Sequence, residues 1–194
     1  MHEIIKLSAL NDNQVNQAVD VFVEGFYNTL RGVSKDKKIL HRLFKTAFDG
    51  DMTYAYLVDG DAVGFLGLAN NQKRPIKLCE ETFIEVLGVS GKRLYKAVSA
   101  AMEKIIVTDA NEIWIDYIAT NPKCRSMGIG KKLIEYICSN LDYKYIRLMV
   151  LSKNPRAISF YEKLGFKKES EKFHLLVFLQ GFGKEITMRM NIDT

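Results

Sequence analysis

The stretch that decides the fold reads Arg125-Ser126-Met127-Gly128-Ile129-Gly130-Lys131. It lies between an apolar run at 113–120 and a helix-periodic run at 129–141, which together predict a strand, a turn and a helix. The start of a helix offers unpaired backbone N–H groups and the positive end of the helix dipole. Two glycines let the backbone approach a bulky anion, because neither carries a Cβ atom. The stretch therefore predicts a cradle for a phosphate or pyrophosphate group.

Two familiar phosphate-binding loops are excluded by counting residues. A Walker loop would need glycine at the place of Arg125 and serine or threonine at the place of Lys132. A dinucleotide-binding fingerprint that starts at Gly128 would need glycine or alanine at the place of Leu133. The pattern that remains is Arg-x-x-Gly-x-Gly directly after a strand.

Three segments, in order, resemble the GNAT superfamily of N-acetyltransferases. The loop matches that family's Arg/Gln-x-x-Gly-x-Gly/Ala acetyl-CoA loop, and Tyr-Ile-Ala-Thr-Asn-Pro at 117–122 matches the strand before it. The third match is Asn-Pro-Arg-Ala-Ile-Ser-Phe-Tyr-Glu-Lys-Leu-Gly-Phe at 154–166. One departure is Lys123-Cys124, which stands where the family more often has an aromatic residue and which leaves the amide cradle in place.

The composition predicts one cytoplasmic globular domain. The chain has 194 residues, 47% of them hydrophobic, which is enough for one substantial core. It contains no run of about 18 apolar residues, the length that a membrane span needs, so no membrane partner is expected. Its start lacks the basic and apolar segments of a signal peptide. The three cysteines are unpatterned, and no Cys/His cluster has metal-ligand spacing, so we expect a reducing cytoplasm, no disulfide and no metal.

The net charge of +5 raises the question of a nucleic-acid partner. The lysines are dispersed and form no long basic run, so no nucleic-acid partner is predicted. A polyphosphate ligand such as coenzyme A uses the same electrostatics locally.

The periodicity of the whole chain predicts an α/β fold. Helices are expected at 15–26, 39–48, most of 76–107 with a break near 88–91, 129–141 and after Asn154. Strands are expected at 3–7, 54–58, 62–68, 113–120, 145–151, 166–168, 173–180 and 185–191. The strand-helix-strand order around the loop predicts a parallel pair with a right-handed crossover. With the resemblance, this implies a GNAT-like three-layer domain with a central mixed sheet of about seven strands flanked by helices.

We expect residues 1–194 to form a single N-acetyltransferase domain. The resemblance places the acetyl-CoA core at about 112–166 and the acceptor side at about 11–107. Residues 76–107 lie in the region that varies with the substrate in the family, so the sequence does not identify the acceptor there.

The resemblance implies that the cofactor is acetyl-CoA, held by the loop and by the strand before it. Amides of the loop would donate to the pyrophosphate, and Arg125 would add a charge-assisted bond. In the family this strand separates from its neighbour, and a backbone N–H on its edge polarises the thioester oxygen as an oxyanion hole does. The predicted cofactor-binding residues are Ile118, Ala119, Thr120, Arg125, Ser126, Met127, Gly128, Ile129, Gly130, Lys131, Asn154 and Tyr161.

Two residues are candidates for proton transfer. The resemblance implies that Tyr161 protonates the coenzyme A thiolate, and the ordinary pKa of a phenol, about 10, is close enough to that of a thiol. The alternative for Tyr161 is packing on the sheet. Asp116 is the candidate base, directly or through water, because strand alternation puts Trp114, Asp116, Ile118 and Thr120 on one face. The alternative for Asp116 is a structural hydrogen bond or ion pair, since a charge inside an apolar strand is costly unless it is paired.

Glu24, near the end of the first long helix, is the candidate acceptor-binding residue, since family members often line the acceptor pocket from this segment. The alternative is an exposed helix glutamate.

The predicted activity is an acetyl-CoA-dependent N-acetyltransferase, an acyltransferase in which a small-molecule or protein amine attacks the thioester directly. No cysteine or serine sits in a recognisable nucleophile setting. The alternative function is a coenzyme A-binding sensor or regulatory module without turnover. Homodimers are common in the family, so a homodimer is also considered.

Overall fold

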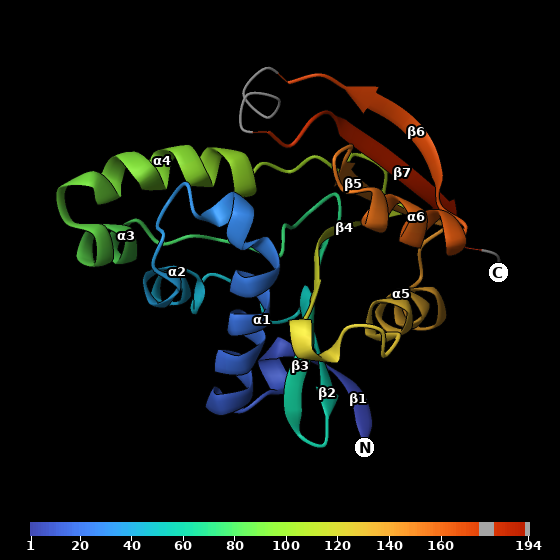
Figure 1. Ribbon diagram of the computed structural model, residues 1–194, viewed down its shortest axis with the longest axis horizontal. Helices are drawn as coiled ribbons and strands as arrows, with labels where there is room; N and C mark the ends of the chain where they lie inside the picture. The colour runs from blue at the N-terminus through green and yellow to red at the C-terminus, as the bar shows by residue number, and fades with distance from the viewer. Residues whose placement is uncertain (175–180, 193–194) are drawn as a thin grey trace.

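The structure is a computed structural model that describes residues 1–174 and 181–192. Seven strands form one mixed sheet in the order β1-β2-β3-β4-β5-β7-β6, in which β4 and β5 are parallel (Figure 1). The strands are β1 (His2–Lys6), β2 (Thr53–Val58), β3 (Asp61–Ala69), β4 (Glu112–Thr120), β5 (Tyr145–Leu151), β6 (Lys167–Lys172) and β7 (Glu185–Asn191). The α-helices are α1 (Asp12–Leu30), α2 (Lys37–Phe44), α3 (Glu80–Leu87), α4 (Gly91–Met102), α5 (Ile129–Asn140) and α6 (Pro155–Lys163).

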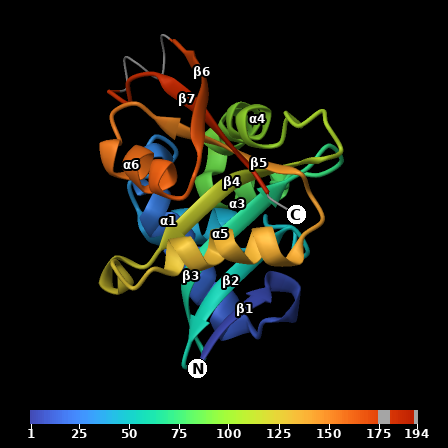
Figure 2. The ribbon, with the colours of Figure 1, turned by 90° about the vertical axis from the view of Figure 1, so that its right-hand side faces the viewer.

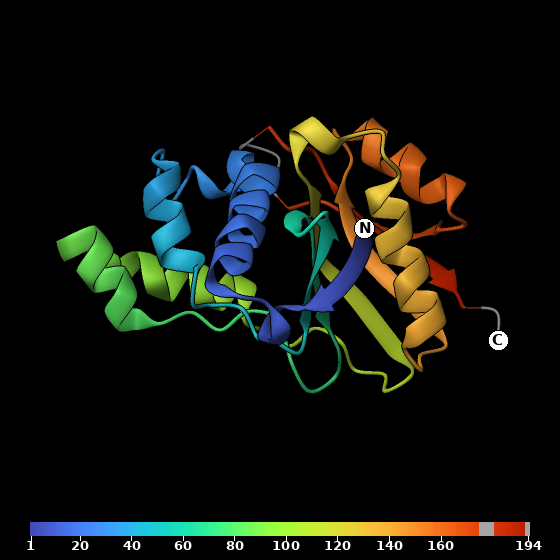
Figure 3. The same cartoon turned by 90° about the horizontal axis from the view of Figure 1, so that it is seen from below.

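Helices cover both faces of the sheet, which confirms the predicted three-layer arrangement (Figure 3). On the α1–α4 side the core is aromatic, and the ring of Phe22 contacts the rings of Phe44, Phe65 and Tyr117. On the other side α5 lies across the strands (Figure 2). The core there is mainly aliphatic and includes Ile113, Leu133, Ile137 and Ile146.

Local sequence signals set several element ends as predicted. Asn11 caps α1 in a reciprocal pair of hydrogen bonds with Gln14. Asp59 and Gly60 form the β2–β3 turn with φ angles of 51° and 90°, the left-handed conformation that a two-residue hairpin needs. Asn154 caps α6, in which a proline takes the first position.

Two predicted element boundaries are wrong. The helix predicted at 39–48 ends at Phe44, because Phe48 leaves the helical path and forms a β-bridge with Ile76. The strand predicted to end at Lys168 continues to Lys172 as β6, because β7 offers it a partner over that length. The strand predicted at 173–180 is absent at residues 173–174, and its remaining positions lie outside the described residues.

The sheet ends on one side at β6, whose sequence is Lys-Lys-Glu-Ser-Glu-Lys. Its side chains are mostly exposed, and the strand pairs with β7 along one edge. Charged side chains are the usual protection of an unpaired strand edge.

A β-bulge at Asp116 interrupts β4. Gly67 of β3 lies opposite Tyr117, and the next residue of β3 lies opposite Ile115, so Asp116 has no partner in β3. The alternation of side chains shifts by one residue there: Ile115 and Ile118 pack in the core beside α5, whereas Tyr117 packs in the core beside α1. The prediction that residues 114, 116, 118 and 120 share one face is therefore wrong, because the extra residue of the bulge reverses the pattern.

Helix α1 lies very close to β4 at Gly25. A Cβ atom added at Gly25 would lie 2.5 Å from the Cβ atom of Ala119. Real Cβ atoms do not approach so closely, so the two small residues fix how near the helix can come to the strand.

We predict that Gly25→Ala lowers the free energy of unfolding by about 1–3 kcal/mol, because the added methyl group forces the helix and strand apart. This outcome opposes the intrinsic preference of helices for alanine over glycine, about 1 kcal/mol. Chemical denaturation with circular dichroism measures the change.

The control is Gly32→Ala, where the nearest atom to the added Cβ lies 3.6 Å away and the expected change is below about 0.5 kcal/mol. Ala119→Gly in the Gly25→Ala background should restore most of the loss. Failure of this second substitution to restore stability would place the cause elsewhere than at this contact.

Candidate functional site

The loop after β4 begins with a firmly anchored turn. The amide of Asn121 donates to the carbonyl of Val63, and its side-chain oxygen accepts from the amide of Lys123. Its own carbonyl accepts from the amide of Cys124. These bonds fix the direction in which the chain leaves β4 and turns toward α5.

The next residues leave a row of backbone amides unused. Ser126 and Gly128 have positive φ angles of 68° and 74°, and α5 starts directly after Gly128. Within the described part of the chain, no amide of residues 125–131 donates a hydrogen bond to protein, and the first helical bond runs from Lys132 to the carbonyl of Gly128. Free amides at a helix start suit an anion, so the loop fits the predicted phosphate cradle.

The two glycines of the loop serve different purposes. A Cβ atom at Gly128 would meet nothing within 4 Å, so that position needs glycine for its left-handed backbone and opens outward. A Cβ atom at Gly130 would lie 3.1 Å from the ring of Phe160 on α6. From the sequence, both glycines were predicted to let the backbone approach the anion. The close packing of α6 on α5 is a second reason for glycine at position 130.

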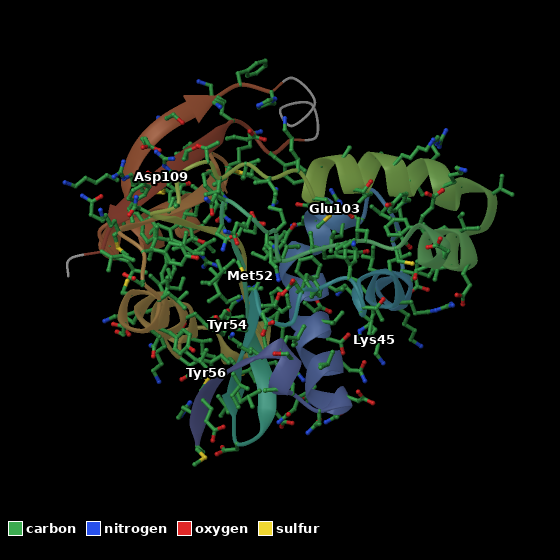
Figure 4. All side chains as sticks on the ribbon, turned by 180° about the vertical axis from the view of Figure 1, so that it is seen from behind. Lys45, Met52, Tyr54, Tyr56, Glu103 and Asp109 are labelled. Carbon is green, nitrogen blue, oxygen red and sulfur yellow. The ribbon has the colours of Figure 1, made fainter. Side chains whose placement is uncertain are left out.

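Lys123, two residues before the row of unused amides, is exposed and forms no ion pair among the described residues. Arg125, the first residue of that row, is also available to an anion. It is exposed and forms no ion pair within residues 1–174 and 181–192. Lys131 is exposed and lies 3.4 Å from Glu135, one helical turn along. The ammonium group of Lys132 donates to the hydroxyl of Tyr56 at 3.1 Å, beside α5 (Figure 4).

The two parallel strands separate next to the loop. Their ladder runs from Glu112 paired with Tyr145 to Ile115 paired with Leu148, and stops there. Beyond this point β4 continues beside β3 as far as residue 120, and β5 continues beside β7 as far as residue 151. On the side toward β5, the backbone of β4 at 116–120 therefore pairs with no strand of the described residues. This is the separation of the two strands that the resemblance implied.

Asp116, the predicted base, is paired with a cation. Its Oδ2 accepts from the Nε of Arg74 at 2.5 Å, and the two side chains are 3% and 9% exposed. Burial raises the pKa of Asp116 to about 6, although the charge and hydrogen bond of Arg74 oppose the rise. The carboxylate is thus engaged in an ion pair, the structural alternative that the sequence left open.

Arg74 is the residue of this site that the sequence reasoning missed. An aspartate inside an apolar strand signals that a cation must approach it. The chain has 28 lysines and arginines, and nothing in the sequence selects Arg74 from the polar loop that follows β3.

Tyr161, the predicted acid, lies on α6 and is buried. Its ring centroid lies 5.2 Å from that of Phe160 and 5.6 Å from that of Phe166. Burial raises the pKa of its phenol above the ordinary value, so the hydroxyl carries its proton at neutral pH. Asn154, at the start of the same helix, uses its side-chain oxygen for the cap.

Glu24, the predicted acceptor-binding residue, is half-exposed and has a partner. Both of its oxygens accept from the ammonium group of Lys37, at 2.6 and 2.7 Å. Glu24 also lines a hollow of about 270 Å³ between α1 and the β2–β3 hairpin, together with Asp20 and Asp61. Asn121 and Pro122, where the loop leaves β4, line the same hollow, so Glu24 on α1 lies beside the start of the loop.

Two further observations concern the described residues alone. No three or more histidine, cysteine, aspartate or glutamate side chains there come together in a way that suits a metal ion. None of the helices there combines the length and apolar character that crossing a membrane requires.

Comparison with known proteins agrees with this geometry. Residues 20–166 match the model of the Acetyltransferase (GNAT) family. The chain is similar to the 5-NmdU N-acetyltransferase of Pseudomonas phage PaMx11, with 34% identity over 62 residues, which are 32% of this chain and 44% of the relative. It is also similar to glucosamine 6-phosphate N-acetyltransferase of Trypanosoma brucei brucei, with 31% identity over 61 residues, which are 31% of this chain and 42% of the relative. The chain thus spans less than half the length of each of these curated relatives.

A solved structure with the same arrangement is the ribosomal-protein-S18-alanine N-acetyltransferase from Escherichia coli. It superimposes with a TM-score of 0.58 and 15% identity, over 100% of this chain and 96% of that one. At this level of identity the likeness concerns the fold alone.

We predict that Asp116 makes the unfolding free energy depend on pH. Its native pKa lies above the ordinary 3.8, so between 3.8 and about 6 the unfolded chain binds fewer protons than the native protein. Relative to Asp116→Asn, wild type should therefore lose roughly 2 kcal/mol of stability as the pH rises from about 4 to about 7. Denaturant titrations at a series of pH values measure this difference.

Asp109→Asn is the matched control with the opposite sign. A hydrogen bond from Tyr145 lowers the pKa of Asp109 to about 2, so its contribution is lost only as the pH falls below the ordinary value of 3.8. A difference between wild type and Asp116→Asn that stays constant from about pH 4 to about pH 7 would show that Arg74 cancels the effect of burial.

Proposed function

Because the chain belongs to the GNAT family of acetyltransferases, we propose that it is an acetyl-CoA-dependent N-acetyltransferase that transfers the acetyl group directly to an amine. One observation carries the proposal: the unused amides at 125–131 follow directly after the unpaired strand edge at 116–120. A ligand that joins a diphosphate to an extended arm with amide groups fits both features at once. Coenzyme A is such a ligand.

The residues at the loop suit the diphosphate of coenzyme A. The free amides of 125–131 and the open side of Gly128 would hold it, with the guanidinium group of Arg125 adding a charge-assisted bond. The backbone of Ile118, Ala119 and Thr120 would pair with the arm. When bound, acetyl-CoA supplies the acetyl thioester.

The side chains around the strand edge have separate roles in the proposal. A backbone N–H at 118–120 polarises the acetyl carbonyl, as an oxyanion hole does. Tyr161, whose phenol is protonated at neutral pH, would donate a proton to the departing sulfur, although burial raises its pKa and makes it a weaker acid than an exposed tyrosine. Asn154 caps α6 and so orients the helix that carries Tyr161. Asp116 is bound to Arg74, so we assign removal of the amine proton to water and to the amine's own equilibrium with solvent.

Direct transfer is favoured over a covalent acyl-enzyme. Among the described residues, the polar partners of the histidines are Asp20, Asn16, Tyr56 and Glu185, and none is a cysteine or serine. The thiol of Cys79 donates to the carboxylate of Glu81 at 3.1 Å, but this pair lies at the start of α3, which Figure 1 shows on the opposite side of the molecule from α5 and α6. It therefore provides no activated nucleophile at the loop or the strand edge.

The acceptor is proposed to be an amine of a small molecule or a protein. The curated relatives are named for a modified nucleoside and an amino sugar phosphate, so the family resemblance leaves the choice open. Glu24 beside the hollow remains the proposed acceptor-side residue: its ion pair with Lys37 is exposed, so a cationic amine could replace Lys37 there at little cost. We further propose one domain over 1–194, with a cofactor part at 112–166 and an acceptor part at 11–107. All three cysteines are free thiols, which supports the proposed cytoplasmic location.

We predict that Gly128→Glu abolishes the binding of acetyl-CoA and of coenzyme A, because glutamate brings bulk and negative charge to the diphosphate cradle. Isothermal titration calorimetry measures both affinities. A wild type that binds neither compound would refute the proposed function. Binding by wild type without acetyl transfer to any primary amine in a broad screen would instead favour a sensor or regulatory module.

The matched control is Gly60→Glu. Gly60 also has a positive φ angle, 90°, and a Cβ atom there would also meet nothing within 4 Å, but it lies in the β2–β3 turn. This variant carries the same backbone strain and the same charge, so it should keep wild-type affinity.

We predict that Tyr161→Phe lowers the turnover number by about 10²-fold or more, because it removes the proton donor and keeps the ring packing. The affinity for acetyl-CoA should change by less than about threefold, since the hydroxyl acts after binding. Turnover is measured as thiol release with the best amine from the screen. Tyr136→Phe on α5 is the control, and an equal loss in both variants would remove Tyr161 from the mechanism.

A further inference from the structure

Arg74 joins two segments that are distant in the sequence. Its Nε donates to Asp116 of β4, 42 residues away, and its Nη1 donates to the carbonyl of Lys104, 30 residues away. Both donor–acceptor distances are 2.5 Å. One guanidinium group thus holds the bulge of β4 and the chain that follows α4 at the same time.

The loop that carries Arg74 is itself fixed. The side-chain oxygen of Asn70 accepts from the amide of Lys73, and the amide of Asp49 donates to the carbonyl of Pro75. Pro75 also packs under the bulge, since a Cβ atom added at Gly67 would lie 3.2 Å from Pro75 and 3.0 Å from the Tyr117 ring. Arg74 therefore approaches the bulge from a rigid base.

The end of α4 is tied to the same loop by a second bond. Glu103, labelled in Figure 4, accepts from the amide of Leu78 at 2.7 Å. Together with the bond from Arg74 to the carbonyl of Lys104, this fixes the end of the α3–α4 pair against the segment at 74–78. In Figure 1 that pair lies on the opposite side of the molecule from α5 and α6.

The bulge held by Arg74 is also the point where β4 and β5 part. The last pair of their ladder is Ile115 with Leu148, one residue before Asp116. The Asp116 and Arg74 side chains are 3% and 9% exposed, so neither can exchange its partner for solvent at little cost. The position of the unpaired strand edge is therefore coupled to this ion pair.

We propose that Arg74 is a positioning residue: by holding Asp116 in the bulge and the carbonyl of Lys104 after α4, it sets the separation of β4 from β5 in which the acyl arm of acetyl-CoA lies. The proposal rests on the proposed function, because it concerns the same strand edge. It assigns Asp116 to positioning as well. A ligand that occupies the loop alone is unaffected by Arg74, whereas a ligand that also occupies the strand edge depends on it.

The test compares two ligands by calorimetry. Acetyl-CoA reaches from the loop to the strand edge, and 3′-phospho-ADP carries the diphosphate without the arm. Arg74→Met should weaken acetyl-CoA binding by about tenfold or more, since a displacement of about 1 Å at a binding edge has effects of that order or larger. Binding of 3′-phospho-ADP should stay within about twofold of wild type.

Arg147→Met is the matched control. Arg147 pairs at 2.7 Å with Glu112, which is 2% exposed and lies on the same strand before the bulge, where the ladder to β5 is intact. This variant should lose thermal stability and keep the wild-type ratio of the two affinities. If Arg147→Met weakened acetyl-CoA binding relative to 3′-phospho-ADP binding as much as Arg74→Met does, the effect would come from lost stability, and the positioning role of Arg74 would be refuted.

If Arg74→Met does not fold, Arg74→Lys is measured in its place. Lysine keeps the charge but not the rigid fork that reaches both Asp116 and Lys104, so acetyl-CoA affinity should fall by about threefold or more. An unchanged affinity ratio in a folded Arg74 variant overturns the proposal and leaves the proposed function intact. If wild type binds neither ligand, both the proposed function and this proposal fail.

Discussion

The bulge in β4 is the constraint on which the rest of the structure depends. A regular strand would pair with β5 along its whole length, and its amides would be used inside the sheet. The pairing with β5 stops after Ile115, the residue just before the bulge, and leaves 116–120 with one unpaired edge. An aspartate inside the sheet requires a buried cation, and Arg74 supplies it. The fold thus buries the ion pair of Asp116 and Arg74 beside residues 116–120, the part of β4 that does not pair with β5.

Glycines allow close packing on both faces of the sheet. On one face Gly25 of α1 lies against Ala119 of β4, and on the other Gly130 of α5 lies against Phe160 of the neighbouring helix α6. Each glycine allows a close approach that a larger residue would prevent. The loop between β4 and α5 therefore joins a strand packed closely against α1 to a helix packed closely against α6.

Much of the fold follows from local sequence signals, and less of the site does. The Asn11 cap, the Asp59-Gly60 turn and the loop at 125–131 are set by neighbouring residues, so their structures were predicted correctly. The bulge at Asp116 is set by Gly67, Pro75 and the distant Arg74, and strand alternation read from the sequence cannot reveal an extra residue. The early end of α2 at Phe44 likewise depends on a bridge to Ile76, far along the chain.

The charged strand β6 has a consequence for self-association. An unpaired strand edge is a template on which another chain can extend the sheet. Pairing of another strand with Lys-Lys-Glu-Ser-Glu-Lys would dehydrate several exposed charged side chains. Growth of the sheet from copy to copy is therefore disfavoured at this edge, although the edge itself is left open.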